Sequence, residues 1–452
     1  MVRRRELPDR ARVVIVGGGV GGAAVAHHLA KLGERDVVLL DRNELTSGST
    51  FHSAGLVGQL RGSVSLTRLM MDSVELYRTL DCGWVQCGGV RLACTPEREQ
   101  EVMRQVAWAK TFGLPLELLT PDEAQELFPL MSTAGVRCAS YLASDGYLDP
   151  SLLTTALVDG AREGGCRVFT HTRVTGIDVE QTAGGGRRVR GVQTEWGAIE
   201  AEVVVNAGGM FAAEIGRMAG VRVPIVPFAH EYLVTQPFRE RASGEHLPTL
   251  RDPDLLIYFR EEGAGLVMGG YERESAPWAL DEHLRDAIPQ DFNGRLLEED
   301  WPRFEEIAKN SSKRVPAMDE ITVTKLINGP EAFTPDNEFC LGESEVAGLF
   351  VAAGFCAHGL AGAGGIGRVM AEWILAGEPT SDVWEMDIRR FGPHFRSPGY
   401  TLKRAKEVYE TYYDIRYPGH ERQAGRPLRV SSAYPWHAEH SAAFGEKSGW
   451  ER

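Results

Sequence analysis

The chain has 452 residues, of which 43% are hydrophobic and 25% charged, a composition that predicts an ordinary folded protein of two or three domains. The net charge of −14, with no basic block beyond Arg3–Arg5, argues against a nucleic-acid partner. No apolar segment is long enough for a membrane span, and acidic and proline residues follow the arginines where a signal peptide would have its apolar core.

The first predicted element is a buried parallel strand over residues 12–16, followed at once by glycines. Gly17 allows a tight turn, Gly19 lets the backbone approach a pyrophosphate, and Gly22 lets the next helix pack closely on the strand. We expect that helix over residues 23–32, with its positive N-terminus facing the phosphates.

A second strand is expected over residues 36–40, closed by Asp41. This acid follows the glycine fingerprint by about 20 residues, where a carboxylate accepts hydrogen bonds from the ribose hydroxyls. It also argues against a 2′-phosphate, and so against NADP. Strand, glycines, helix, strand and acid in this order predict a dinucleotide-binding unit.

His52 lies in the loop of small residues that follows this unit. Its position would carry the side chain away from the adenosine end of the nucleotide, towards a reactive ring. A histidine there could bind a flavin covalently, or it could simply pack or hydrogen-bond within the loop. A lone histidine does not decide between these interpretations.

The middle of the chain alternates helical and strand patterns. Thr120 and Glu123 form a predicted capping box at the start of one helix, and Gly184–Gly186 marks a hairpin tip. The expected elements are helices over 64–80, 97–112, 121–128 and 151–164, a strand over 166–170, a β-meander over 173–203, a buried strand over 201–209 and antiparallel sheet over 221–272.

A last strand, glycine-rich turn and helix are expected over residues 348–376, with the helix from residue 366. The turn could place a helix N-terminus against a bound ring, or its glycines could serve close packing alone. Three strand-to-glycine turns in one chain favour a large FAD-type fold over a single NAD module.

We therefore predict an α/β fold (α+β overall) with a Rossmann-type FAD-binding domain and an interleaved antiparallel-sheet substrate domain. The FAD-binding domain is expected to be discontinuous, and residues 386–452 to form a C-terminal extension. The expected ranges are 1–85, 150–215 and 325–385 for the FAD-binding domain, and 86–149 and 216–324 for the substrate domain.

The seven cysteines are odd in number and scattered, which fits reduced thiols and predicts a cytoplasmic protein. Cys82 and Cys87 lie close together, but no second Cys/His pair stands nearby to complete a zinc site. We expect no metal centre.

Several motifs carry a family resemblance that covers nearly the whole chain: the glycine fingerprint, Asp41, the late glycine turn, and the segments 48–56, 223–232, 257–260 and 328–336. Together they resemble the dimethylglycine dehydrogenase and sarcosine dehydrogenase family, of the D-amino-acid-oxidase type of flavoproteins. The resemblance implies FAD bonded covalently through His52. A covalent cysteine found in related sarcosine oxidases has no counterpart here, because Asn328, Gly329 and Pro330 occupy that stretch.

The resemblance also implies that His230 and Tyr258 line the substrate side of the flavin, where His230 would accept a proton and Tyr258 would orient the substrate. Taken alone, both are ordinary strand residues. Arg260 and Arg61 could bind a substrate carboxylate, or could be structural arginines. The predicted cofactor-binding residues are Gly17, Gly19, Gly22, Asp41, Arg42, Ser49, Thr50, His52, Gly55, Leu56, Val174, Ala207, Gly208, Gly354, His358, Gly364 and Gly365.

The implied chemistry is oxidative N-demethylation of a secondary or tertiary methylamine, such as dimethylglycine or sarcosine, by hydride transfer to flavin N5. The iminium product would yield the demethylated amine and formaldehyde. The electron acceptor would be oxygen or an electron-transfer flavoprotein. In the family a folate-binding half follows the flavin half. Here residues 424–450 resemble the hinge into it and the chain stops at Arg452, so formaldehyde is released, a separate folate-binding subunit captures the carbon, or the sequence is a fragment.

Two alternatives remain open at this point. The enzyme could oxidise another amine or a D-amino acid. The chain could also be a non-catalytic flavin-binding subunit, like the regulatory subunit of pyruvate dehydrogenase phosphatase, which resembles this family. His52, His230 and Tyr258 argue against the second alternative.

Overall fold

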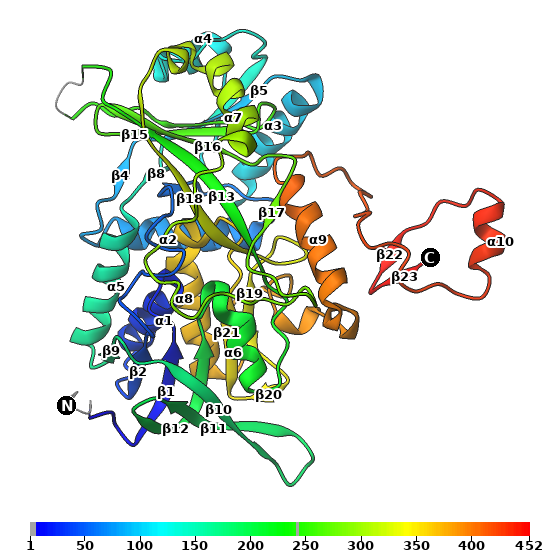
Figure 1. The fold of residues 1–452 in the computed structure, drawn as a ribbon. Helices are drawn as coiled ribbons and strands as arrows, with labels where there is room; N and C mark the ends of the chain where they lie inside the picture. Colours follow the sequence, from blue (N-terminus) through cyan, green and yellow to red (C-terminus); the bar gives the residue numbers. More distant parts are fainter. Residues whose placement is uncertain (1–5, 241–243) are drawn as a thin grey trace.

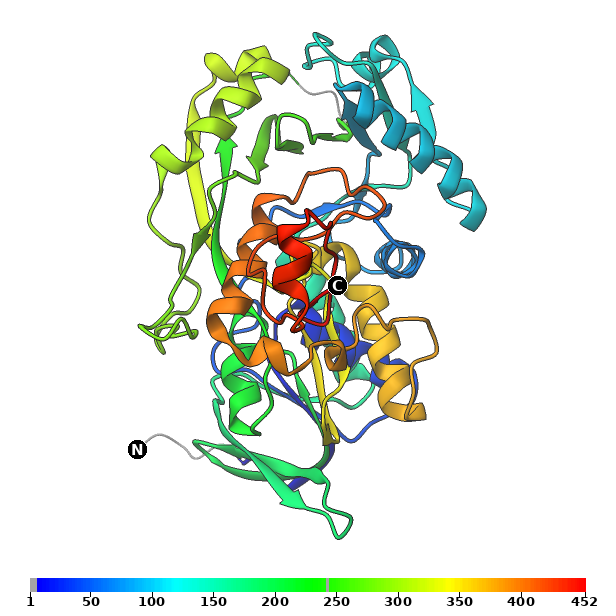
Figure 2. The same cartoon turned by 90° about the vertical axis from the view of Figure 1, so that its right-hand side faces the viewer.

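The computed structural model describes residues 6–240 and 244–452, so the basic run Arg3–Arg5 lies outside it. Within these ranges the chain forms two nine-stranded sheets, one of mixed and largely parallel pairing and one mostly antiparallel. Figures 1 and 2 show the first sheet in the lower half of the molecule and the second in the upper half. The predicted α/β class with an added antiparallel sheet is confirmed.

The first sheet has a parallel centre in the order β9–β2–β1–β12–β21. Its strands are buried on both faces, because Ile15 packs into one apolar cluster and Val14 into another. The β10–β11 hairpin and the short strands β19 and β20 extend this centre. The strands are β1 (Arg10–Val16), β2 (Val37–Leu40), β9 (Arg167–Phe169), β10 (Val174–Gln181), β11 (Arg187–Thr194), β12 (Gly197–Asn206), β19 (Cys340–Glu343), β20 (Val346–Ala347) and β21 (Leu349–Ala353).

Four helices cover one face of this sheet and share one hydrophobic cluster with it. They are α1 (Val20–Lys31), α2 (Val64–Tyr77), α5 (Pro150–Glu163) and α8 (Gly359–Ala376). On the other face a second hydrophobic cluster joins the central strands to α6 (Ala212–Met218) and to the β10–β11 hairpin. None of the helices in the described ranges has an apolar stretch long enough to cross a lipid bilayer.

Helix α8 begins at Gly359, seven residues before the predicted start, and this corrects the predicted glycine turn. Glycine disfavours helix in isolation, so the sequence indicated a turn. Here close packing decides instead. A Cβ on Gly365 would collide with the Leu69 carbonyl oxygen of α2, and one on Gly364 would lie 2.7 Å from Ser73 Cα. Packing therefore accounts for Gly364 and Gly365, which were predicted to bind the cofactor.

The second sheet runs in the order β17–β13–β16–β15–β14–β5–β7–β6, with β18 paired to β13. The expected antiparallel sheet over 221–272 is confirmed for β13 to β16. Strand β18 pairs with β13 from Val226↔Phe333 to Thr235↔Val323, so the predicted boundary at residue 325 wrongly divides this sheet. The strands are β5 (Gly89–Ala93), β6 (Glu117–Leu119), β7 (Cys138–Leu142), β13 (Val226–Thr235), β14 (Thr249–Asp252), β15 (Ile257–Glu262), β16 (Gly265–Gly270), β17 (Ala276–Pro277) and β18 (Val323–Phe333).

Helices α3 (Pro96–Ala109), α4 (Pro121–Leu127), α7 (Trp301–Arg314) and α9 (Pro398–Glu410) accompany the second sheet. The predicted capping box is present, since Thr120 Oγ1 accepts from the Glu123 N–H and the Glu123 side chain accepts from the Thr120 N–H. The remaining elements are the three-stranded set β3 (Leu56–Val57), β4 (Val85–Gln86) and β8 (Gly146–Tyr147), the 3₁₀ turns η1 (Lys110–Phe112), η2 (Gly209–Phe211), η3 (Pro316–Asp319), η4 (Ile388–Arg390) and η5 (Pro393–Arg396), and the C-terminal α10 (Tyr434–Glu439), β22 (Glu446–Lys447) and β23 (Trp450–Glu451).

Candidate active site

A first cavity opens at the carboxyl ends of the parallel strands, where doubly wound sheets bind nucleotides. Gly17 follows β1, Asp41 follows β2 and Ala207 follows β12. Ten of the predicted cofactor residues line it: Gly17, Gly19, Asp41, Arg42, Ser49, Thr50, Val174, Ala207, Gly208 and Gly354.

The glycine fingerprint leaves no room for side chains at this edge. Gly17 has a φ of +119°, and a Cβ there would collide with the Ala207 carbonyl oxygen. A Cβ on Gly22 would overlap the Gly17 carbonyl oxygen, so Gly22 serves the helix–strand contact rather than the cavity wall. A Cβ on Gly19 would lie 3.1 Å from Thr50 Oγ1. At this edge the backbone therefore borders the cavity without covering side chains, as the binding of a pyrophosphate requires.

Asp41 organises the rim of this cavity. Its Oδ2 accepts from the Gly18 N–H at 2.6 Å, and its Oδ1 accepts from the Asn43 N–H at 2.8 Å. Burial raises the pKa of Asp41, whereas these two N–H groups stabilise the charged form. The N-cap Gly19 offers no side chain to α1, and Thr50 Oγ1 accepts from the Val20 N–H instead, at 3.2 Å. The glycine cradle and the carboxylate together fit a dinucleotide.

His52 lines a second cavity, and its neighbour Ser53 lines both cavities. Ser49 ties the loop to β18, donating from Oγ to the Pro330 carbonyl oxygen at 2.6 Å. The His52 ring fills the space above Gly329, where any side chain would collide with it. His52 Nε2 is buried and, among the described residues, has no hydrogen-bond partner. Burial lowers the pKa of His52 to about 4, so the imidazole is neutral.

The second cavity, of about 540 Å³, shares wall residues with the first, namely Ser53, Glu331, Ala357 and Leu360. Its wall unites predicted residues that are far apart in sequence: His52, Arg61, His230, Tyr258 and His358. Gly55 and Leu56, predicted to bind the cofactor, line this cavity and not the first. The sequence did not single out Arg91, Arg251, Tyr271, Glu331, Tyr412 and Tyr413, which also line it.

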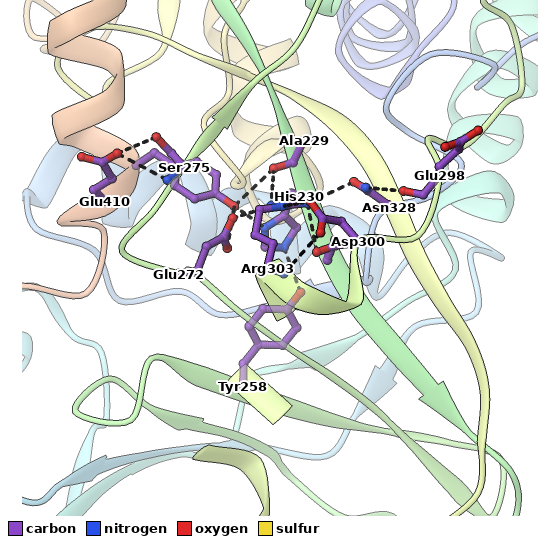
Figure 3. Close-up of polar contacts among 12 residues, drawn as sticks. Ala229, His230, Tyr258, Glu272, Ser275, Glu298, Asp300, Arg303, Asn328 and Glu410 are labelled. Atoms are coloured by element: carbon purple, nitrogen blue, oxygen red, sulfur yellow. Dashed lines mark hydrogen bonds and ion pairs between the residues drawn. The ribbon is translucent and has the colours of Figure 1, made fainter. Parts of the chain in front are cut away.

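His230 on β13 and Tyr258 on β15 are in contact across the intervening strand β16, at a position where β16 has a glycine. Tyr258 pairs with Gly269 of β16, and the phenol lies across this glycine, where a Cβ would collide with it. The Tyr258 hydroxyl reaches His230 Nε2 at 3.2 Å (Figure 3). Burial lowers the pKa of His230 to about 3, with Arg303 acting in the same direction, and burial raises that of Tyr258 well above its ordinary value. Tyr271 stacks on His230 with ring centroids 4.4 Å apart.

The two arginine candidates differ in placement. Arg61 lines the second cavity, its Nε has no partner among the described residues, and burial lowers its pKa to about 10. Arg260 donates to the carbonyl oxygens of Ala54 and Glu261 and pairs with Glu262, and it lines neither of these two cavities. Of the two interpretations given for Arg260, these contacts support the structural one, and the substrate-binding one is corrected: this side chain fixes the loop that follows His52.

One group of potential metal ligands was not identified from the sequence. Cys94, Asp252 and Asp254 lie close enough together to hold an ion. However, Arg314 pairs with Asp252 at 2.8 Å and Arg98 with Asp254 at 3.1 Å, so guanidinium groups already compensate these carboxylates.

Comparison with known proteins agrees with this geometry. Over 99% of its length the chain is 36% identical to the sarcosine dehydrogenase, mitochondrial, of Homo sapiens, and over 98% of its length it is 36% identical to the dimethylglycine dehydrogenase, mitochondrial, of the same species. The chain spans about half the length of these relatives, 49% and 51% respectively. Among solved structures, the L-proline dehydrogenase from P. horikoshii is 29% identical, with a TM-score of 0.76 over 85% of this chain and 98% of that one.

Two family models divide the chain between them. The FAD dependent oxidoreductase central domain matches residues 376–431, and so covers part of the predicted C-terminal extension. The FAD dependent oxidoreductase model matches residues 12–373, which include nearly all of both sheets, the whole lining of the first cavity and most of that of the second. The chain belongs to the FAD dependent oxidoreductase family.

Proposed function

We propose that this chain is the flavin-binding part of an enzyme that oxidatively N-demethylates a secondary or tertiary methylamine, such as sarcosine or dimethylglycine. The observation that carries the proposal is the buried pair of neutral groups, His230 and Tyr258, in a cavity that shares a wall with the nucleotide cavity. The names of the two dehydrogenases support the choice of substrate.

FAD, when bound, would supply the hydride acceptor for the N-methyl carbon. The chain's own groups would prepare the amine. Only a neutral amine can stabilise, through its lone pair, the cation that forms as hydride leaves. A buried cavity disfavours the ammonium, and the hydrogen-bonded His230–Tyr258 pair offers a route by which its proton can leave. Arg61 is positioned to hold a carboxylate of the substrate.

Hydrolysis of the methylene-iminium product gives the demethylated amine and formaldehyde. Capture of the carbon by a separate folate-binding subunit stays a prediction, as do the electron acceptor, oxygen or an electron-transfer flavoprotein, and a cytoplasmic location. The substrate is tested by rapid mixing of the flavin-loaded protein with sarcosine, dimethylglycine, longer N-methylamines and D-amino acids. Loss of flavin absorbance with an N-methyl amino acid is the expected result.

A flavin reduced only by D-amino acids or by other amines would replace the proposed substrate with that class. A flavin that no amine reduces would overturn the proposed function and favour a binding subunit. His230→Asn provides the matched control, because it should slow reduction by about 100-fold or more without emptying the nucleotide cavity.

We further propose that FAD is bonded covalently to His52. A buried neutral imidazole with a free Nε2, in the second cavity and next to Ser53, which lines both cavities, supports this assignment. Acid precipitation tests it: the pellet of the wild-type protein should be yellow, and that of His52→Ala colourless. His358→Ala changes another histidine of the same cavity and should leave the pellet yellow. A colourless wild-type pellet, or a yellow His52→Ala pellet, would contradict the assignment.

A further inference from the structure

The hydroxyl of Tyr409, on α9, reaches the side of His230 opposite to Tyr258. It lies 3.1 Å from His230 Nδ1 and 3.1 and 3.2 Å from the two carboxylate oxygens of Glu272. The Ala229 carbonyl oxygen is 3.5 Å away. Tyr409 is fully buried, so these groups account for its hydrogen bonding.

The Glu272 carboxylate is held in place by Arg303 of α7 (Figure 3). Arg303 also donates to the Ala229 carbonyl oxygen at 3.1 Å and pairs with Glu231 at 3.0 Å. Burial raises the pKa of Glu272, while the Arg303 guanidinium and the Tyr409 hydroxyl stabilise its charged form. Paired with a guanidinium, the carboxylate is an acceptor only.

A phenol has a single hydrogen to donate. Three of the four atoms around the Tyr409 oxygen, those of Glu272 and Ala229, can only accept, so the Tyr409 hydrogen points to them. The fourth atom, His230 Nδ1, must then donate to the Tyr409 oxygen. In a neutral imidazole a hydrogen on Nδ1 leaves Nε2 as an acceptor.

We propose that Tyr409 and Glu272 are positioning residues that hold His230 in the tautomer protonated on Nδ1, so that a bare Nε2 faces the Tyr258 hydroxyl. Tyr258 then donates to Nε2, at 3.2 Å, and its oxygen lone pairs are left to face the cavity. The pair is therefore directional: it accepts a proton at Tyr258 and passes one to His230 in transit only, because burial and Arg303 hold the pKa of His230 at about 3.

The proton transfer, which rests on the proposed function, balances as follows. An N–H bond of the substrate ammonium breaks and an O–H bond forms on Tyr258, while the original Tyr258 O–H bond breaks and an N–H bond forms on His230 Nε2. Nothing is oxidised or reduced in this step. The imidazolium keeps its Nδ1 hydrogen bond to Tyr409, whose own hydrogen bond to Glu272 brings a negative charge within reach.

The tautomer is measured by long-range ¹H–¹⁵N NMR on holoprotein labelled with ¹⁵N-histidine, with the His230 signals assigned by their loss in His230→Asn. The expected wild-type spectrum has a protonated Nδ1 and an unprotonated Nε2. Tyr409→Phe should lose this single pattern and populate both tautomers. Tyr400→Phe removes a hydroxyl from the same helix without touching His230 and should keep the wild-type pattern.

A wild-type His230 protonated on Nε2 would overturn the proposal even if neither Tyr409→Phe nor Glu272→Gln folds. A Tyr409→Phe spectrum with Nδ1 still fully protonated would also overturn it. Glu272→Gln is a second variant, and it should weaken the tautomer preference because a neutral amide can donate as well as accept. Failure of every amine to reduce the flavin would remove the proposed function and leave the tautomer measurement unaffected, so the two failures are distinguishable.

Discussion

The two cavities are built by opposite means. The first is made of backbone: glycines without room for a Cβ, N–H groups around Asp41, and the open end of α1. The second is made of side chains from distant elements, and ionised groups such as Arg303 and Glu272 lie buried behind its wall. The difference implies that added volume should damage the nucleotide region, while altered charge should damage the substrate region.

The largest effect is expected from added volume at Gly22. In Gly22→Val the Cβ would overlap the Gly17 carbonyl oxygen, and neither backbone can retreat, because α1 is buried between β1 and α8. We expect the free energy of unfolding to fall by about 4 kcal/mol or more, with loss of flavin binding. Urea unfolding and the flavin-to-protein absorbance ratio measure both.

Gly184→Ala is the control, since a Cβ at this hairpin tip meets no atom within 4 Å. A Gly22→Val protein that holds flavin and loses less than about 1 kcal/mol would show that the backbone yields. The expectation that added volume damages the nucleotide region would then be wrong.

The nucleotide region could be predicted from sequence because its parts are local. The strand, the glycines, α1 and Asp41 all lie within residues 10–41, and each leaves a compositional mark. The prediction was wrong at the start of α8, where residues 359–365 were predicted as a turn. A Cβ on Gly367 would lie 2.5 Å from the Ala24 carbonyl oxygen of α1, a contact between segments more than 300 residues apart that no local pattern reveals.

The substrate region could be predicted only in part. His230 and Tyr258 came from a family resemblance, and their alternation in the strands marks neither residue as special. Tyr409 lies 179 residues from His230 and Glu272 lies 137 residues from Tyr409, so their meeting depends on how α9 docks against the second sheet. Arg260 illustrates the opposite error. It lies two residues after Tyr258 in the sequence, yet its side chain donates to the Ala54 carbonyl oxygen of a loop and does not reach the cavity.

An effect of intermediate size is expected from changing a buried ionisable group, the carboxylate of Glu231. This residue neighbours His230 on β13, is 2% exposed, and shares Arg303 with Glu272, so one guanidinium faces two carboxylates. Burial raises the pKa of Glu231 from its ordinary value of 4.5 to about 7. The folded state thus binds a proton that the unfolded state releases, and stability from this group is present below pH 4.5 and is lost as pH rises through 7.

Glu231→Gln removes that dependence and keeps an acceptor for the Asp300 N–H. From pH 4.5 to pH 7 the wild type should lose up to about 3 kcal/mol of stability relative to this variant, measured by urea unfolding at several pH values. Glu200→Gln, at an exposed position of β12, controls for the loss of one carboxylate. A constant difference between wild type and Glu231→Gln across this range would contradict the role given to buried charge.

The smallest effect is expected in the first cavity, from the loss of a single side-chain hydrogen bond. Gly19 cannot cap α1, and Thr50 Oγ1 accepts from the Val20 N–H in its place. Thr50→Val keeps the shape, removes the acceptor, and should cost about 1 kcal/mol of stability, the usual size of a lost helix cap. Thr50→Ser keeps the hydroxyl and should recover most of that loss in the same urea titration. If Thr50→Val keeps the wild-type stability and Thr50→Ser loses it, the methyl group of Thr50 and not its hydrogen bond supports the helix, and this rim of the nucleotide cavity would then depend on volume alone.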